Sequence, residues 1–159
     1  MPHYKNHKLR TGRYSEAGRI YLVTSCCEKH RQVFQEFTAA RIVVDEIKRC
    51  ATERLCDNLT YVVMPDHVHW LLQVSQGGEL SNIVGLMKGR SARRVNQLGT
   101  IKAKLWQGGF HDHAVRREED LENLSNYVVH NPLRAGLVSS VDDYPHWWSA
   151  WHKRVAVRG

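Results

Sequence analysis

Residues 59–74, LTYVVMPDHVHWLLQV, decide the fold of this chain. Two runs rich in β-branched and aromatic residues stand on either side of Pro65 and Asp66. Such runs favour β-strands, while Pro followed by Asp favours a tight turn or a break between strands. We therefore expect two strands joined by a short turn, and we place them at the heart of a sheet.

Further strands and helices are expected on both sides of this segment. Residues 19–27, RIYLVTSCC, are a short β-type run, and residues 110–117, FHDHAVRR, are another strand candidate. Apolar residues recur at spacings of three and four over about 38–55 and again over about 79–98. This spacing places them on one face of a helix, so it predicts a helix in each range.

A third helix is expected to begin near Glu118, where acidic residues suit the positive end of the helix dipole, and to end close to Pro132. The order strand, helix, strand, strand, helix, strand, helix predicts an α+β fold, with a central antiparallel β-sheet and helices packed against it. A length of 159 residues favours one domain. Residues 1–18 are expected to form a basic N-terminal arm. Residues 138–159 form a Trp-rich C-terminal tail whose tryptophans cap the core, with base stacking as the alternative.

His67 and His69 are the first candidates for chemistry. Side chains two positions apart in a strand share a face, so these imidazoles project together while Val68 and Trp70 point the other way. Two adjacent imidazoles can bind a metal ion, although a buried histidine is more often a hydrogen-bonded core residue. A metal site here needs a third ligand and a group that acts on the substrate.

Tyr127 and Asn131 supply both on the third helix, because residues four apart are neighbours on one helix face. The amide oxygen of Asn131 is a hard ligand suited to Mg²⁺ or Mn²⁺. The phenol of Tyr127 can attack phosphorus as a phenolate when a divalent ion polarises the phosphate. The alternative for Tyr127 is a half-buried tyrosine of an amphipathic helix.

Three strings carry a resemblance to a known family: MPDHVHW at 64–70, LWQGGFHDHAVR at 105–116 and YVVHNPLRAGLV at 127–138. Together they resemble the single-tyrosine transposase superfamily with a His-hydrophobe-His (HUH) motif. Within it, the chain is similar to the transposases associated with repetitive extragenic palindromes (REP), relatives of the small insertion-sequence transposases that work on single-stranded DNA. The resemblance runs from the GRIYLVT strand to about Val138 and implies the ferredoxin-like HUH endonuclease fold.

By this resemblance, His67, His69 and Asn131 bind the metal ion and Tyr127 is the nucleophile. The implied reaction is a transesterification that links the tyrosine to a 5′ phosphate and releases a 3′ hydroxyl. The implied substrate is single-stranded DNA beside a hairpin formed by an imperfect palindrome. Insertion-sequence relatives exchange the tyrosine helix across a dimer, whereas the palindrome-associated group resembles monomers, and the Trp-rich tail favours a monomer here.

The charge of the chain favours a polyanionic partner, since 23 Lys and Arg stand against 16 Asp and Glu, a net charge of +7. Basic residues outside the apolar stripe of the second helix are expected to contact phosphates, with a solvated basic face as the alternative. The predicted DNA contacts come from this helix and from the 110–117 segment. They are Lys88, Arg90, Arg93 and Arg94 on the helix, and His111 and Arg116 in the segment.

Two functions from other classes stay open. A second His-x-His, at His111 and His113, allows a zinc hydrolase that uses four histidines and does not need Tyr127. A DNA-binding module without catalysis, whose histidines are structural, would bind DNA whether or not a chelator is present. The cysteines lack Cys-x-x-Cys spacing, and neither a long apolar run nor a signal-like start is present. We therefore expect a reduced, cytoplasmic protein with no membrane partner.

Overall fold

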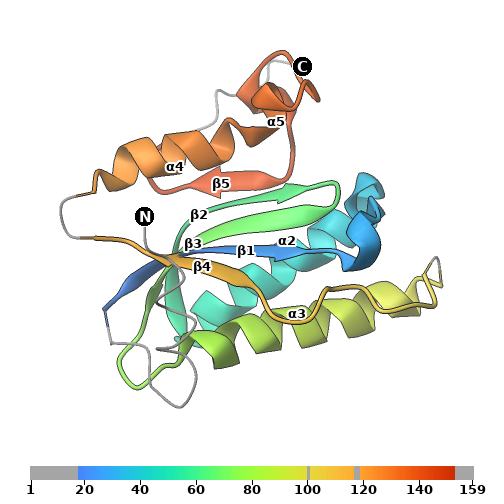
Figure 1. The fold of residues 1–159 in the computed structure, drawn as a ribbon, viewed down its shortest axis with the longest axis horizontal. Helices are drawn as coiled ribbons and strands as arrows, with labels where there is room; N and C mark the ends of the chain where they lie inside the picture. The colour runs from blue at the N-terminus through green and yellow to red at the C-terminus, as the bar shows by residue number, and fades with distance from the viewer. Residues whose placement is uncertain (1–17, 100, 117–118, 153–159) are drawn as a thin grey trace.

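The structure is a computed structural model, and it describes residues 18–99, 101–116 and 119–152. The strands in these residues form one sheet in the order β4-β1-β3-β2-β5, and each neighbouring pair is antiparallel (Figure 1). Their bounds are β1 Ile20–Cys26, β2 Cys56–Met64, β3 His67–Val74, β4 His111–Ala114 and β5 Trp147–Ser149. The predicted α+β fold with a central antiparallel sheet is confirmed.

Strands β2 and β3 form the expected hairpin around Pro65 and Asp66, with Met64 paired to His67. Strand β3 also pairs with β1 on its other side, where Thr24 lies opposite His69. The segment that decides the fold therefore occupies the middle of the sheet, and β3 has a hydrogen-bonded neighbour on both edges.

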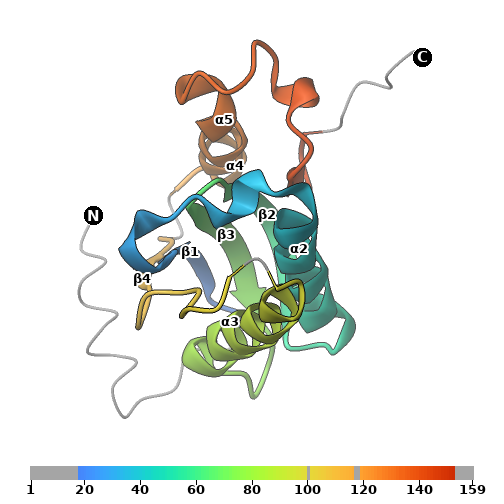
Figure 2. The same cartoon turned by 90° about the vertical axis from the view of Figure 1, so that its right-hand side faces the viewer.

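Helices α2 (Phe37–Thr52) and α3 (Leu80–Gln97) cover one face of the sheet, as the two views in Figures 1 and 2 show. Trp70 is fully buried on this face, in one apolar cluster with Ile47 of α2 and Ile83 of α3. Glu36 caps α2, because its carboxylate accepts hydrogen bonds from the backbone N–H groups of Thr38 and Ala39. None of the described helices is both long and apolar enough to cross a membrane.

Helices α4 (Leu121–Val129) and α5 (Asn131–Arg134) lie on the opposite face of the sheet, next to β5 (Figure 1). Helix α4 packs against β2 and β5. A second apolar cluster fills this interface, with Val62 and Met64 of β2, Val128 and Val129 of α4, and Trp147 of β5 among its members. Three short 3-10 helices complete the described elements: η1 Glu28–His30, η2 Val33–Gln35 and η3 Val141–Asp143.

The start of the third helix differs from the sequence prediction. The third helix begins at Leu121 rather than near Glu118, since the carboxylate of Asp120 caps it by accepting from the N–H groups of Glu122 and Asn123. Glu118 itself lies outside the described residues, as do residues 1–17 of the predicted basic arm and 153–159 of the tail.

The Trp-rich tail was expected to cap the core with all three tryptophans, and this was wrong for two of them. Trp147 is buried, but Trp148 and Trp151 are 42% and 38% exposed. Residues 147–149 form edge strand β5, so Trp147 and Trp148 point to opposite faces of the sheet. Trp151 lies beyond the end of this strand. Trp148 stacks on Tyr61 of β2, with ring centroids 6.2 Å apart.

Candidate active site

His67 and His69 lie side by side on the sheet face opposite α2 and α3. Their ring centroids are 4.8 Å apart and the rings stand nearly perpendicular to each other. Val68 and Trp70, the alternate residues of β3, are fully buried on the other face. The predicted common orientation of the two imidazoles is confirmed.

Each imidazole is held by a hydrogen bond at its Nδ1 atom. The Nδ1 atom of His67 lies 2.7 Å from a carboxylate oxygen of Asp66. An ionised carboxylate can only accept a hydrogen bond, so Nδ1 of His67 carries the proton and donates it. The Nδ1 atom of His69 lies 2.9 Å from the hydroxyl of Thr24 on β1. Contacts of this kind fix ring orientation and leave Nε2 as the nitrogen that can bind a metal ion. Sequence reasoning missed Asp66 and Thr24, although Asp66 directly precedes His67.

Burial keeps the imidazole of His69 in its neutral form. The pKa of His69 is lowered to about 4, first because the ring is buried, and further by the nearby His67 and Arg134. A lowered pKa keeps the ring neutral near pH 7, and neutral imidazole is the form that coordinates metals.

Asn131 lies at the break between α4 and α5. Pro132 has no N–H to donate to the carbonyl of Val128, and the side-chain Nδ2 of Asn131 donates to that carbonyl instead, at 2.9 Å. This bond engages the amide nitrogen and leaves the amide oxygen as the atom that can bind a cation. Backbone hydrogen bonds continue across the break, from the His130 N–H to Asn126 and from the Arg134 N–H to His130.

Tyr127 is 60% exposed on α4, so its hydroxyl is accessible to a large substrate. The guanidinium carbon of Arg134, on α5, lies 3.9 Å from the centroid of the Tyr127 ring. The positive charge of Arg134 also contributes to the lowered pKa of His69. Sequence reasoning missed Arg134, although its place seven residues after Tyr127 is the spacing of one helix face.

A family model described as IS200-like transposase matches residues 18–131, which include the histidine pair, Tyr127 and Asn131. The chain belongs to the IS200-like transposase family. It is therefore an enzyme that cleaves and joins DNA, and the expected resemblance to tyrosine transposases is confirmed.

Individual relatives agree with this family. A REP-associated tyrosine transposase of Escherichia coli is 23% identical over 144 residues, which cover 90% of this chain and 82% of that protein. The ISDra2 transposase TnpA of Deinococcus radiodurans is 34% identical over 83 residues, 52% of this chain and 59% of that protein. The solved structure of a REP-associated tyrosine transposase bound to a REP hairpin matches with a TM-score of 0.70 and 23% identity, covering 85% of this chain and 79% of that one. This match confirms the HUH fold.

The second histidine pair of this IS200-like transposase lies at the edge of the same sheet face. His111 of β4 pairs with Thr24 of β1, the residue that contacts His69. His113 is already engaged, because its Nε2 lies 3.1 Å from Glu119. Among the described residues, no three His, Cys, Asp or Glu side chains gather as a metal site, so the four-histidine zinc cluster has no support in the geometry. A surface pocket of about 200 Å³ opens beside His111, lined also by Thr24, Cys26 and residues 107–110.

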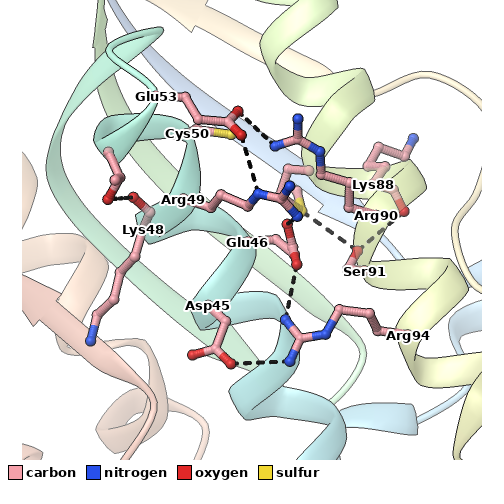
Figure 3. Close-up of polar contacts among 12 residues, drawn as sticks. Asp45, Glu46, Lys48, Arg49, Cys50, Glu53, Lys88, Arg90, Ser91 and Arg94 are labelled. Atoms are coloured by element: carbon pink, nitrogen blue, oxygen red, sulfur yellow. Dashed lines mark hydrogen bonds and ion pairs between the residues drawn. The ribbon is translucent and has the colours of Figure 1, made fainter.

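Three of the basic residues predicted to contact DNA have partners within the chain. Figure 3 shows Arg90 and Arg94 of α3 reaching across to α2, where Arg90 binds Glu53 at 2.8 Å and Arg94 binds Glu46 at 2.9 Å. Lys88 donates to the carbonyl oxygens of residues 107 and 109, at 2.7 and 2.5 Å, and its burial lowers the pKa of its ammonium group.

The other predicted contacts are differently placed. Arg93 is exposed on α3, and α3 lies on the sheet face opposite the histidine pair. His111 and Arg116 lie on or just after β4. Contact of any of these residues with DNA stays a prediction.

Proposed function

We propose that this transposase is a metal-dependent, single-stranded DNA endonuclease and strand transferase that acts at hairpins of imperfect palindromes through a covalent 5′-phosphotyrosine. Tyr127 is the nucleophile, and His67, His69 and Asn131 bind Mg²⁺ or Mn²⁺. The observation that carries this proposal is that α4 and α5, which bear Tyr127 and Asn131, lie over the same sheet face as the histidine pair.

The residues present fit a hard divalent ion. Two imidazoles with engaged Nδ1 atoms and one amide oxygen supply three ligand atoms. Mg²⁺ takes six ligands, so oxygens of water or substrate would complete its coordination. When bound, the ion polarises the scissile phosphate as a Lewis acid. The carboxylate of Asp66 supports this set from behind, by accepting from the Nδ1–H of His67.

The reaction at Tyr127 is a transesterification. The phenol oxygen forms a bond to phosphorus, the bond from phosphorus to the 3′ oxygen breaks, and the phenol proton ends on the released 3′ hydroxyl. The number of phosphoester bonds does not change. A 3′ hydroxyl from another strand can therefore reverse the step and join to the 5′ phosphate without ATP.

The DNA strand is placed along the face that carries the histidine pair. The exposed Tyr127 and the pocket beside His111 suit a single strand on this face. The net charge of +7 suits a polyanionic partner in general. The REP hairpin bound to the structural relative supports a hairpin beside the cut. His111 and Arg116 are the proposed backbone contacts on this face. Arg93 is a proposed contact only for DNA that reaches α3 on the opposite face, and Lys88, Arg90 and Arg94 are already bound by partners within the chain.

The test is a denaturing gel after incubation of the protein with Mn²⁺ and a labelled hairpin that carries single-stranded flanks. Wild type is expected to form a covalent protein–DNA adduct that requires the metal. Tyr127→Phe should abolish the adduct and leave hairpin binding nearly intact, because it removes only the hydroxyl from an exposed ring. Tyr144→Phe, which removes a buried hydroxyl that donates to Val63, is the control for loss of a phenol elsewhere. Strand cleavage that survives in Tyr127→Phe contradicts the proposal and favours a hydrolase.

A further inference from the structure

Arg134 is an exposed arginine of α5 that contacts the proposed nucleophile, Tyr127. Its side chain lies over the ring of Tyr127, at 3.9 Å from the centroid, and its residue is exposed. In the described part of the chain it forms no ion pair, whereas Arg90 and Arg94 are bound by carboxylates of α2. A guanidinium that lies over an aromatic ring still has its N–H edges available for an anion.

The backbone of Arg134 is held firmly in the one-turn helix α5. Its N–H donates to the carbonyl of His130 at 2.9 Å, and Pro132 in the same turn is buried. After the helix, the N–H of Leu137 donates to the carbonyl of Pro132 at 2.9 Å. The backbone of Arg134 is therefore fixed next to the end of α4, the helix that bears Tyr127.

We propose that Arg134 is a catalytic residue that binds a non-bridging oxygen of the scissile phosphate and neutralises the charge that builds up there while Tyr127 attacks. This inference rests on the proposed function. Arg134 forms and breaks no covalent bond, since the phosphoryl group passes from the 3′ oxygen to the phenol oxygen and the phenol proton ends on the 3′ hydroxyl. Its N–H groups donate to phosphate oxygens, and its stacking holds the otherwise exposed ring of Tyr127 in place.

The experiment measures the single-turnover rate of adduct formation with saturating hairpin DNA and Mn²⁺. It compares wild type, Arg134→Gln and Arg134→Lys. Arg54→Gln is the matched control, because Arg54 is an exposed arginine just beyond α2, on the far side of the sheet. Each protein is tested on a normal substrate and on one with an uncharged methylphosphonate at the scissile position.

On the normal substrate, Arg134→Gln is expected to slow adduct formation by about 100- to 1000-fold, as for loss of one donor to a developing anion. Hairpin affinity should change little, since one phosphate contact among many is lost. Arg134→Lys should fall between, because it keeps the charge without the planar fork. On the methylphosphonate substrate the difference between wild type and Arg134→Gln should largely disappear, since there is less charge to neutralise. Arg54→Gln should match wild type on both substrates.

Three results would overturn the inference. A wild-type rate in Arg134→Gln would show that the guanidinium is not used. If wild type and Arg134→Gln differ in rate by the same factor on the methylphosphonate as on the normal substrate, Arg134 only orients the tyrosine ring through stacking. Failure of wild type to form any adduct would remove the proposed function and this inference with it, whereas the first two results leave the proposed function standing.

Discussion

Asp66 is the residue on which the histidine pair depends most directly. Its carboxylate lies 2.7 Å from Nδ1 of His67, and its second oxygen lies 3.8 Å from the ring of His30. A carboxylate behind a metal-binding imidazole fixes the tautomer and makes the other nitrogen a stronger donor to the ion. The strength of the metal site should therefore depend on a residue that does not itself touch the metal.

We predict that Asp66→Ala lowers the affinity for Mn²⁺ by about 10- to 100-fold, the usual cost of losing such a partner. Asp66→Asn should lose less, because its amide oxygen still accepts from His67. Isothermal titration calorimetry on metal-free protein measures both. Asp57→Ala, at an exposed position of β2, is the control. Equal affinities in wild type and Asp66→Ala would show that the ion is bound elsewhere.

Helix α4 is attached to the sheet by three buried hydroxyl groups as well as by apolar packing. The hydroxyl of Ser125 lies 2.5 Å from that of Thr60 on β2 and 2.7 Å from that of Ser149 on β5. Ser125 is two residues before Tyr127, so these bonds hold the part of the helix that carries the proposed nucleophile. The hydroxyl of Ser125 lies between the other two, so its loss affects both Thr60 and Ser149.

Ser125→Ala is expected to lower the free energy of unfolding by about 1–3 kcal/mol, because it leaves the buried hydroxyls of Thr60 and Ser149 without this partner. Urea unfolding followed by tryptophan fluorescence gives the value. Ser139→Ala, at an exposed position after α5, should stay within about 0.5 kcal/mol of wild type. A wild-type stability for Ser125→Ala would mean that apolar packing alone holds α4.

Two neighbouring arginines of α3 have different surroundings: Arg94 is bound by carboxylates of α2, whereas Arg93 is exposed. Glu46 is buried, and Arg94 binds its carboxylate at 2.9 Å. We predict that Arg94→Ala lowers the free energy of unfolding by about 2–3 kcal/mol, because a buried carboxylate loses a charged hydrogen bond. Arg93→Ala should leave stability within about 0.5 kcal/mol.

The same two variants have the opposite expectation in DNA binding. Arg93→Ala should flatten the slope of log affinity against log salt by about 0.7 to 0.9, the value for one phosphate contact. Arg94→Ala should leave the slope nearly unchanged. A salt titration of hairpin binding decides this. If neither slope changes, α3 is a solvated surface and the DNA lies entirely on the other face of the sheet.

The elements that could be predicted from sequence are those with a local period. The apolar stripes of α2 and α3 and the β-type runs around Pro65 repeat over enough residues to identify them. Strand β5 has only the residues 147–149, too few to show alternation, and its pairing with β2 depends on a distant strand. In the site, the spacing of His67 and His69 was sufficient to predict their common face. The hydroxyl of Thr24 was not predictable, because it reaches His69 only through the β1–β3 register.

For the whole molecule, the packing of α4 and β5 on β2 bears on whether Tyr127 acts with the histidine pair of its own chain or of a second copy. In this structure α4 lies on β2 and is followed by β5, which pairs with β2 on its outer edge. Exchange of α4 with a second copy would also have to remove β5 from β2, or leave it behind on a strained connection. The apolar cluster around Trp147 and the bonds of Ser125 join both elements to the same sheet. We propose on this basis that the protein is a monomer whose tyrosine and histidines come from one chain.

Mixing two inactive variants tests this arrangement directly. We predict that Tyr127→Phe and His67→Ala/His69→Ala, each unable to form the adduct, stay inactive when combined in any ratio. In a monomer every site lacks either the tyrosine hydroxyl or the pair of histidines. In a dimer that exchanges α4, a mixed pair would combine the intact tyrosine of one chain with the intact histidines of the other. One of the two sites in such a mixed dimer would then regain activity. When the two variants are present in equal amounts and associate at random, about half of all dimers are mixed. The adduct gel measures recovery, and light scattering on the wild type at the same concentration measures the mass of the particle. Recovery of the adduct in the mixture, together with a dimer mass, would show that the tyrosine helix is exchanged despite the packing of β5.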